Sequence, residues 1–141
     1  MSPANASVSG CGFHHVAIKT ADWDASIRFY MDVLGFQKKT AWGSNGSRGI
    51  WLDGGDGIYL EVFEDIAYRP EPKGSIAHLA LKTDDCDSLV ERARSAGARI
   101  TMEPRDLVVP SIPPTPVRIA FCEGPEGAVI EFVQLGIPSS S

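Results

Sequence analysis

The chain contains two copies of one pattern, and this internal repeat limits the folds that it can adopt. Residues 15–24 read His-Val-Ala-Ile-Lys-Thr-Ala-Asp-Trp-Asp, and residues 78–87 read His-Leu-Ala-Leu-Lys-Thr-Asp-Asp-Cys-Asp. A second pair follows, with Asp-Gly-Ile-Tyr-Leu-Glu-Val at 56–62 and Glu-Gly-Ala-Val-Ile-Glu-Phe at 126–132. Each half therefore has a His near its start and a Glu near its end, which indicates two related modules.

Length and composition exclude several classes of protein. A chain of 141 residues is one domain or two small fused modules. Its hydrophobic share of 43% and charged share of 22% are typical of a soluble globular protein, and a net charge of -5 argues against nucleic-acid binding. No apolar run reaches the roughly 20 residues of a membrane span, and no signal peptide is visible. Cys11, Cys86 and Cys122 are odd in number and widely spaced, which predicts reduced thiols and a cytoplasmic location.

Apolar periodicity predicts the same order of elements in both halves: a strand, a helix and three more strands. Ile27, Tyr30, Met31 and Leu34 have helical spacing, so we expect a helix over 23–34 that Asp22 caps and Gly35 ends. The second helix is expected at 86–96, between Asp85 as its cap and Gly97. Alternating and β-branched residues predict the strands. Their expected ranges are 13–19, 36–42, 49–52 and 57–63, then 76–82, 98–102, 117–122 and 128–133.

These elements define the expected fold class, α+β, with two tandem βαβββ modules forming a curved mixed sheet around a metal site. The expected boundaries are a flexible tail at 1–11, a first module at 12–64, a linker at 65–74, a second module at 75–135 and a flexible tail at 136–141. Residues 109–116 carry four prolines, which predicts a stiff loop that does not pair regularly in a sheet and that lines a pocket.

The four repeated polar residues form a predicted metal site. His15 and His78 lie on the first strand of each module, and Glu61 and Glu131 lie on the last. Each Glu interrupts an apolar strand face, where an uncompensated carboxylate is costly and a metal-bound one is satisfied. Imidazole and carboxylate donors suit one divalent ion such as Ni, Co, Mn, Fe or Zn. With about six positions around most of these ions, about two remain for water or a substrate with adjacent oxygens.

This site suggests proton abstraction next to a carbonyl. The metal would stabilise the negative charge of an enediolate, while Glu131 or Glu61 carries the proton. A lone His or Glu on a strand is more often structural, and the repetition in both halves is what favours the metal interpretation. His14 is the rival of His15, but the repeat aligns His14 with Ala77.

The remaining polar residues have competing interpretations. Asp22 and Asp85 are expected to cap helices rather than to bind metal. Lys19, like Lys82, is a candidate contact for an anionic substrate or a solvated side chain. Arg118 is a candidate anion-binding residue or a surface residue, and Cys122 is expected in the core rather than as a nucleophile.

The chain resembles the vicinal oxygen chelate superfamily, which includes glyoxalases, bleomycin-resistance proteins and extradiol dioxygenases. The matching stretches lie at 15–36, 60–62, 77–81 and 121–132. The resemblance implies a metal set of His15, Glu61, His78 and Glu131, like that of glyoxalase I, and a homodimer acting on a small molecule, with the metal site within one chain or shared between chains.

Two positions depart from the glutathione-dependent glyoxalases, which carry Arg and Asn where this chain has Lys19 and Asp65. An Asp is electrostatically unfavourable where a glutathione carboxylate approaches. We therefore expect a metal-dependent lyase or isomerase with another small substrate. The alternatives are an antibiotic-modifying enzyme of the fosfomycin type and a metal-free protein that sequesters an antibiotic.

Overall fold

The computed structural model describes residues 7–8, 13–70 and 76–135. The chain divides into two compact units, Met1–Arg69 and Pro70–Ser141, and each is described by itself. Apart from residues 7–8, the expected tails at 1–11 and 136–141 lie outside the described residues, and so does the expected linker beyond residue 70. No helix among the described residues is long and apolar enough to cross a membrane.

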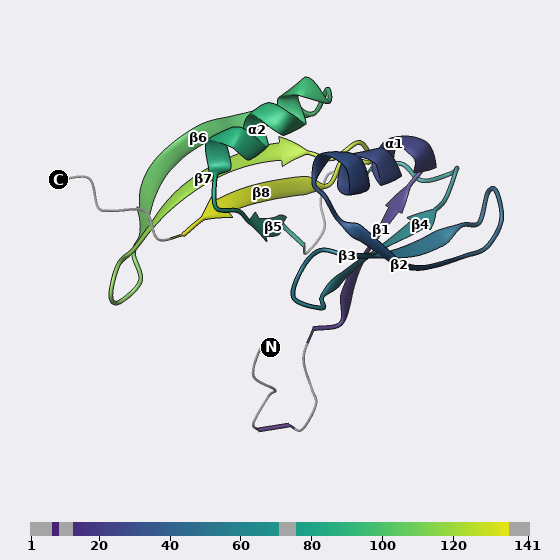
Figure 1. The fold of residues 1–141 in the computed structure, drawn as a ribbon, viewed down its shortest axis with the longest axis horizontal. Coiled ribbons are helices and arrows are strands. Elements are labelled where there is room, and N and C mark those ends of the chain that lie inside the picture. Colours follow the sequence, from purple (N-terminus) through teal and green to yellow (C-terminus); the bar gives the residue numbers. More distant parts are fainter. Residues whose placement is uncertain (1–6, 9–12, 71–75, 136–141) are drawn as a thin grey trace. The chain divides into compact units, whose positions relative to one another are not determined.

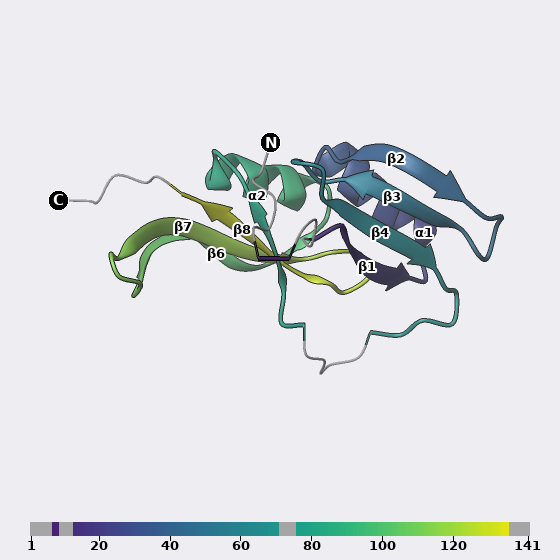
Figure 2. The ribbon, with the colours of Figure 1, turned by 90° about the horizontal axis from the view of Figure 1, so that it is seen from below.

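The first unit is a four-stranded mixed sheet with one short helical segment, shown in Figure 2. The strand order is β1-β4-β3-β2, with β1 parallel to β4 and the other pairs antiparallel. The helical segment consists of α1 (Trp23–Ile27) and η1 (Arg28–Val33). The strands are β1 (His15–Thr20), β2 (Gln37–Trp42), β3 (Gly49–Asp53) and β4 (Tyr59–Glu64).

The second unit repeats this topology, with the order β5-β8-β7-β6 and β5 parallel to β8. Helix α2 (Cys86–Ser95) lies across one face of the sheet and contacts β6, β7 and β8 (Figure 1). The strands are β5 (Leu79–Lys82), β6 (Arg99–Val109), β7 (Thr115–Glu123) and β8 (Val129–Gln134). Two four-stranded mixed sheets with few helices confirm the expected α+β class, and neither sheet closes on itself.

The predicted helix caps are confirmed in both units. The Asp22 carboxylate accepts a hydrogen bond from the Ala25 amide at 3.1 Å, and Asp85 accepts one from Ser88 at 3.0 Å. Asp22 and Asp85 thus satisfy amide groups that a helix start leaves unpaired. Gly35 follows the first helical segment with a φ of 78°, a conformation that glycine adopts without a steric penalty.

The first helical segment differs from the regular helix predicted over 23–34. Its second half is a π-helix, because the Leu34 amide donates to the Phe29 carbonyl five residues earlier at 3.0 Å. Phe29, Tyr30 and Val33 are buried within this turn. A single widened turn leaves the apolar spacing almost unchanged, so periodicity alone did not reveal it.

The core of each unit lies on one face of its sheet. Leu60 and Val62 on β4 are buried, and so are their partners Leu52 and Ile50 on β3. In the second unit, Ile130 and Phe132 on β8 are fully buried, together with residues of α2 such as Val90. Because strand residues alternate between faces, Glu61 and Glu131 lie on the face opposite to these core residues.

The proline-rich stretch at 109–116 was predicted as an unpaired loop, and this prediction is wrong at both of its ends. Val109 pairs with Thr115, and Val108 pairs with Pro116, so β6 and β7 form a long hairpin. Pro116 is tolerated because β7 pairs with β8 only from Arg118 onward. Pro104 also lies inside β6, at a register shift on an edge strand, where its missing N–H breaks no regular pairing.

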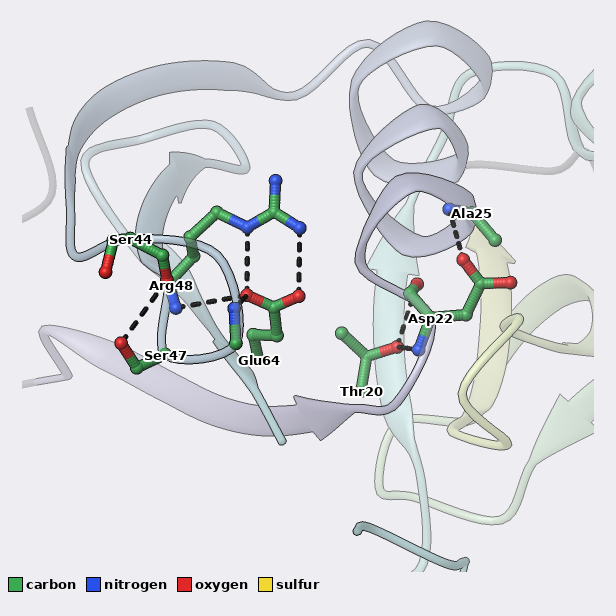
Figure 3. Close-up of polar contacts among 8 residues, drawn as sticks. Thr20, Asp22, Ala25, Ser44, Ser47, Arg48 and Glu64 are labelled. Carbon is green, nitrogen blue, oxygen red and sulfur yellow. Dashed lines mark hydrogen bonds and ion pairs between the residues drawn. The ribbon is translucent and has the colours of Figure 1, made fainter. Parts of the chain in front are cut away.

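An ion pair anchors the loop between β2 and β3 to the end of β4, as Figure 3 shows. The Arg48 guanidinium donates two hydrogen bonds of 2.9 Å to the Glu64 carboxylate. The amides of Gly46 and Arg48 donate to the same carboxylate at 2.8 and 3.2 Å. The hydrogen bonds from Arg48 lower the pKa of Glu64 to about 2.

We predict that this carboxylate contributes an acid-dependent part of the stability. A carboxyl group whose pKa is lowered in the folded state stabilises it fully above the unfolded pKa of about 4.3, and this contribution is lost as the pH falls toward 2. The melting temperature should therefore fall less steeply between about pH 4.5 and 2 in Glu64→Gln than in the wild type. Arg48→Met should reduce the pH dependence of the melting temperature in the same way. Parallel curves for the wild type and Glu64→Gln, measured by circular dichroism, would contradict the prediction.

Candidate metal half-sites

The strand register brings one His next to one Glu in the first unit. Ala17 on β1 pairs with Glu61 on the parallel strand β4, and His15 precedes Ala17 by two residues on the same strand face. The His15 Nε2 atom lies 3.2 Å from the Glu61 Oε1 atom. Glu61 is only 8% exposed, so its carboxylate is largely removed from water.

A tryptophan completes this half-site, and the sequence analysis did not identify it. Trp51 on β3 is the register partner of Glu61, and its indole Nε1–H donates a hydrogen bond of 2.7 Å to the Glu61 Oε2 atom. The indole also stacks on the rings of His15 and Tyr59, with both centroid distances at 5.7 Å. The strands that became β3 and β4 had been predicted at 49–52 and 57–63, but their pairing and register had not.

His14, the rival of His15, also lies at this half-site. Its Nδ1 atom is 2.9 Å from the Nδ1 atom of His15. Its ring packs edge-on against Trp51, with centroids 4.8 Å apart. The two histidines therefore have different positions, since it is the Nε2 atom of His15 that faces the carboxylate.

The second unit has a His–Glu pair at the same register. Ala80 on β5 pairs with Glu131 on the parallel strand β8, and His78 precedes Ala80 by two residues. The His78 Nε2 atom lies 3.3 Å from the Glu131 Oε1 atom. The register partner of Glu131 on β7 is Phe121, whose ring contacts the His78 ring edge-on at 5.4 Å. Phe121 occupies the place of Trp51 but has no N–H to donate.

Each unit thus offers one imidazole and one carboxylate, a donor pair that suits a borderline divalent ion. Within residues 7–8, 13–70 and 76–135, no group of three or more His, Cys, Asp or Glu is poised to hold a metal. A single pair provides too few protein ligands for tight binding, since structural and catalytic zinc sites use three or four.

The two basic residues predicted to contact substrate both have acidic neighbours. The Lys19 Nζ atom lies 3.9 Å from an Asp65 carboxylate oxygen, at an exposed position. Arg118 donates two hydrogen bonds to Asp87, at 2.7 and 2.9 Å, and one to Asp106 at 2.9 Å. These bonds lower the pKa of Asp87 and favour the surface role that the sequence had left open for Arg118.

The cysteine interpretation agrees with the structure for the described thiols. Cys122 is fully buried on β7, and burial raises its pKa to about 11. Cys86 is also buried, and burial raises its pKa. A protonated, inaccessible thiol is a poor nucleophile, so Cys122 is a core residue as predicted.

Comparison with known proteins agrees with this architecture. A family model described as the Glyoxalase/Bleomycin resistance protein/Dioxygenase superfamily matches residues 12–132. A lactoylglutathione lyase of Haemophilus influenzae is 28% identical over 126 residues, which cover 85% of this chain and 90% of that protein.

Solved structures with the same fold include glyoxalase I from Zea mays, with a TM-score of 0.74 at 22% identity. The match covers 89% of this chain and 45% of the maize chain, so this chain spans about half the length of that enzyme. An antibiotic-binding protein from Streptomyces has a TM-score of 0.64 at 21% identity, over 89% of this chain and 97% of its own. The matching stretch at 12–132 contains both His–Glu pairs, and the chain belongs to the glyoxalase/bleomycin resistance protein/dioxygenase superfamily.

Proposed function

We propose that this protein is a divalent-metal-dependent lyase or isomerase of glyoxalase type that acts on a small substrate with vicinal oxygens. The observation that carries the proposal is the His–Glu pair that recurs at the same register in both units. Relatives that are named lactoylglutathione lyase, at 25–29% identity, support this class of chemistry.

In this proposal, His15, Glu61, His78 and Glu131 together hold one ion of Ni, Co, Mn, Fe or Zn. The residues fit such an ion because each pair combines an imidazole nitrogen with a carboxylate oxygen about 3 Å away. The low exposure of Glu61 adds support, since a buried carboxylate requires a compensating positive charge. The four ligands would meet within one chain or across a dimer.

The bound ion would supply Lewis acidity that stabilises the negative charge of an enediolate derived from the substrate. The chain's own carboxylates would carry the proton. Glu61 contacts both His15 and the Trp51 indole, whereas Glu131 contacts His78 and accepts no indole hydrogen bond from the described residues. We therefore assign proton transfer to Glu131 and a holding role to Glu61.

The runner-up function is sequestration of an antibiotic without metal, and aromatic side chains favour it. Trp42 and Phe63 are 41% and 36% exposed on the face that carries Glu61, and their rings contact each other edge-on. The Trp42 indole lies over Gly49, where an added Cβ would be 2.3 Å from the ring. Such a surface suits a planar apolar ligand as well as a substrate. Metal content separates the two functions, because a sequestering protein should purify without stoichiometric metal.

We predict one divalent ion per set of His15, Glu61, His78 and Glu131. His78→Ala and Glu131→Gln should each lose most of the ion, because each variant removes one of four ligands. Glu123→Gln, which alters a half-buried carboxylate on β7 that pairs with Arg99, is the matched control and should retain it. The measurement is elemental analysis after dialysis, and unchanged metal in His78→Ala would contradict the ligand assignment.

We predict a homodimer. Each sheet has open edges, and exposed apolar side chains such as Val108, Val109 and Ile112 lie on or next to β6. Unpaired edges and apolar surface are commonly buried by a second copy. Sedimentation equilibrium at micromolar concentration should give twice the chain mass of 15.2 kDa, and the mass of a single chain would count against the prediction.

We predict weak or no activity with the glutathione hemithioacetal of methylglyoxal. Lys19 lacks the bidentate fork of Arg and already lies beside Asp65, which would repel a substrate carboxylate. Relative to a glyoxalase with Arg and Asn at these two positions, kcat/KM should be roughly 30- to 1,000-fold lower. The assay uses nickel-, cobalt- and zinc-loaded protein, and the double variant Lys19→Arg/Asp65→Asn should gain activity. A wild-type kcat/KM of about 10⁴ M⁻¹s⁻¹ or more would show that the pocket accepts glutathione.

A further inference from the structure

We propose that Trp51 and His14 are positioning residues that orient the Glu61 and His15 side chains for metal binding, and that Phe121 and Ala77 at the equivalent positions of the second unit do not take this role. The inference rests on the proposed function, because it concerns the metal that the two His–Glu pairs would hold. It adds two residues that neither the repeat nor the family's metal set identifies.

Trp51 holds one carboxylate oxygen of Glu61 through a hydrogen bond. Its indole Nε1–H donates to the Oε2 atom of Glu61 at 2.7 Å, which leaves the Oε1 atom facing His15 at 3.2 Å. An indole has one donor and no acceptor, so it occupies one oxygen of the carboxyl group only. Glu61 would therefore bind the metal through a single defined oxygen.

Trp51 itself is held in place by neighbouring rings and by its strand. Its ring stacks on His15 and Tyr59, and it meets His14 and Trp42 edge-on. It also lies on β3 as the register partner of Glu61, so the backbone pairing fixes the position of its Cα atom relative to that of Glu61. A donor that cannot rotate freely is what a positioning role requires.

The two histidines of the first half-site contact each other directly. The Nδ1 atoms of His14 and His15 are 2.9 Å apart, so one of them donates to the other. With a metal bound, we assign the proton to the Nδ1 atom of His15, since its Nε2 atom then presents a lone pair to the ion on the side of Glu61. A metal-binding His commonly donates its other ring N–H to a neighbour in this way.

The second unit lacks both supports at the equivalent positions. Phe121 is the register partner of Glu131, where Trp51 is the partner of Glu61. Ala77 precedes His78, where His14 precedes His15. The two pairs are thus equivalent in their backbone register but different in how their side chains are held.

The test compares Trp51→Phe with Trp23→Phe in the full-length chain. Trp51→Phe introduces the residue that the second unit uses. Trp23 on α1 is a matched control, because its ring contacts Arg48 in the β2–β3 loop rather than the half-site. Calorimetric titration with Ni²⁺, Co²⁺ and Zn²⁺ should give a Kd about 10- to 100-fold weaker for Trp51→Phe, and unchanged for Trp23→Phe. His14→Ala should weaken the Kd in the same direction.

A second readout needs no metal. In the ¹H–¹⁵N spectrum of the metal-free protein, the indole resonance that Trp51→Phe removes should shift in Glu61→Gln and stay in place in Glu123→Gln. Failure of the wild type to bind any of the three ions would overturn the proposed function and this inference with it. Wild-type binding with an unchanged Kd in both Trp51→Phe and His14→Ala, or an unmoved indole resonance in Glu61→Gln, would overturn this inference alone.

Discussion

The parallel pairing of the first and last strands of each unit is the constraint on which the candidate site depends. In β1 with β4 and in β5 with β8, the residue opposite the Glu is an Ala, and the His lies two positions before it. Parallel strands require a long connection, and here the helix and the two intervening strands provide it. The β-α-β-β-β order is therefore what places two residues that are distant in sequence about 3 Å apart.

Along the last strand of each unit, residues that stabilise the core alternate with the Glu of the half-site. In β4, Leu60 and Val62 face the core, while Glu61 faces the opposite side with Tyr59 and Phe63. In β8, Ile130 and Phe132 are buried beside Glu131 in the same way. A one-residue slip in either pairing would bury the carboxylate in the core and expose the apolar residues. The free energy that favours the native register therefore also maintains the arrangement of the half-site.

Much of this organisation could be predicted from the sequence, because it depends on local patterns and on the repeat. The caps Asp22 and Asp85, the element order and the equivalence of the two His–Glu positions all have signals in the residues. The π-helical turn and the extension of β6 through Pro104 were missed, since they depend on hydrogen bonds and register shifts rather than on composition. Trp51 was missed because register between neighbouring strands is a tertiary property. The metal set itself stays a prediction.

Gly49 gives the face of the first sheet that carries Glu61 a single point of adjustment. The Trp42 indole rests where a Cβ at this position would lie, so any other residue at 49 would displace the ring. The backbone pairing of Gly49 with Trp42 and Phe63 would not have to change. A lineage that carries this fold can therefore reshape the surface beside Glu61 by one substitution at a position that supplies none of the proposed metal ligands, which separates the evolution of selectivity from that of the ligand set.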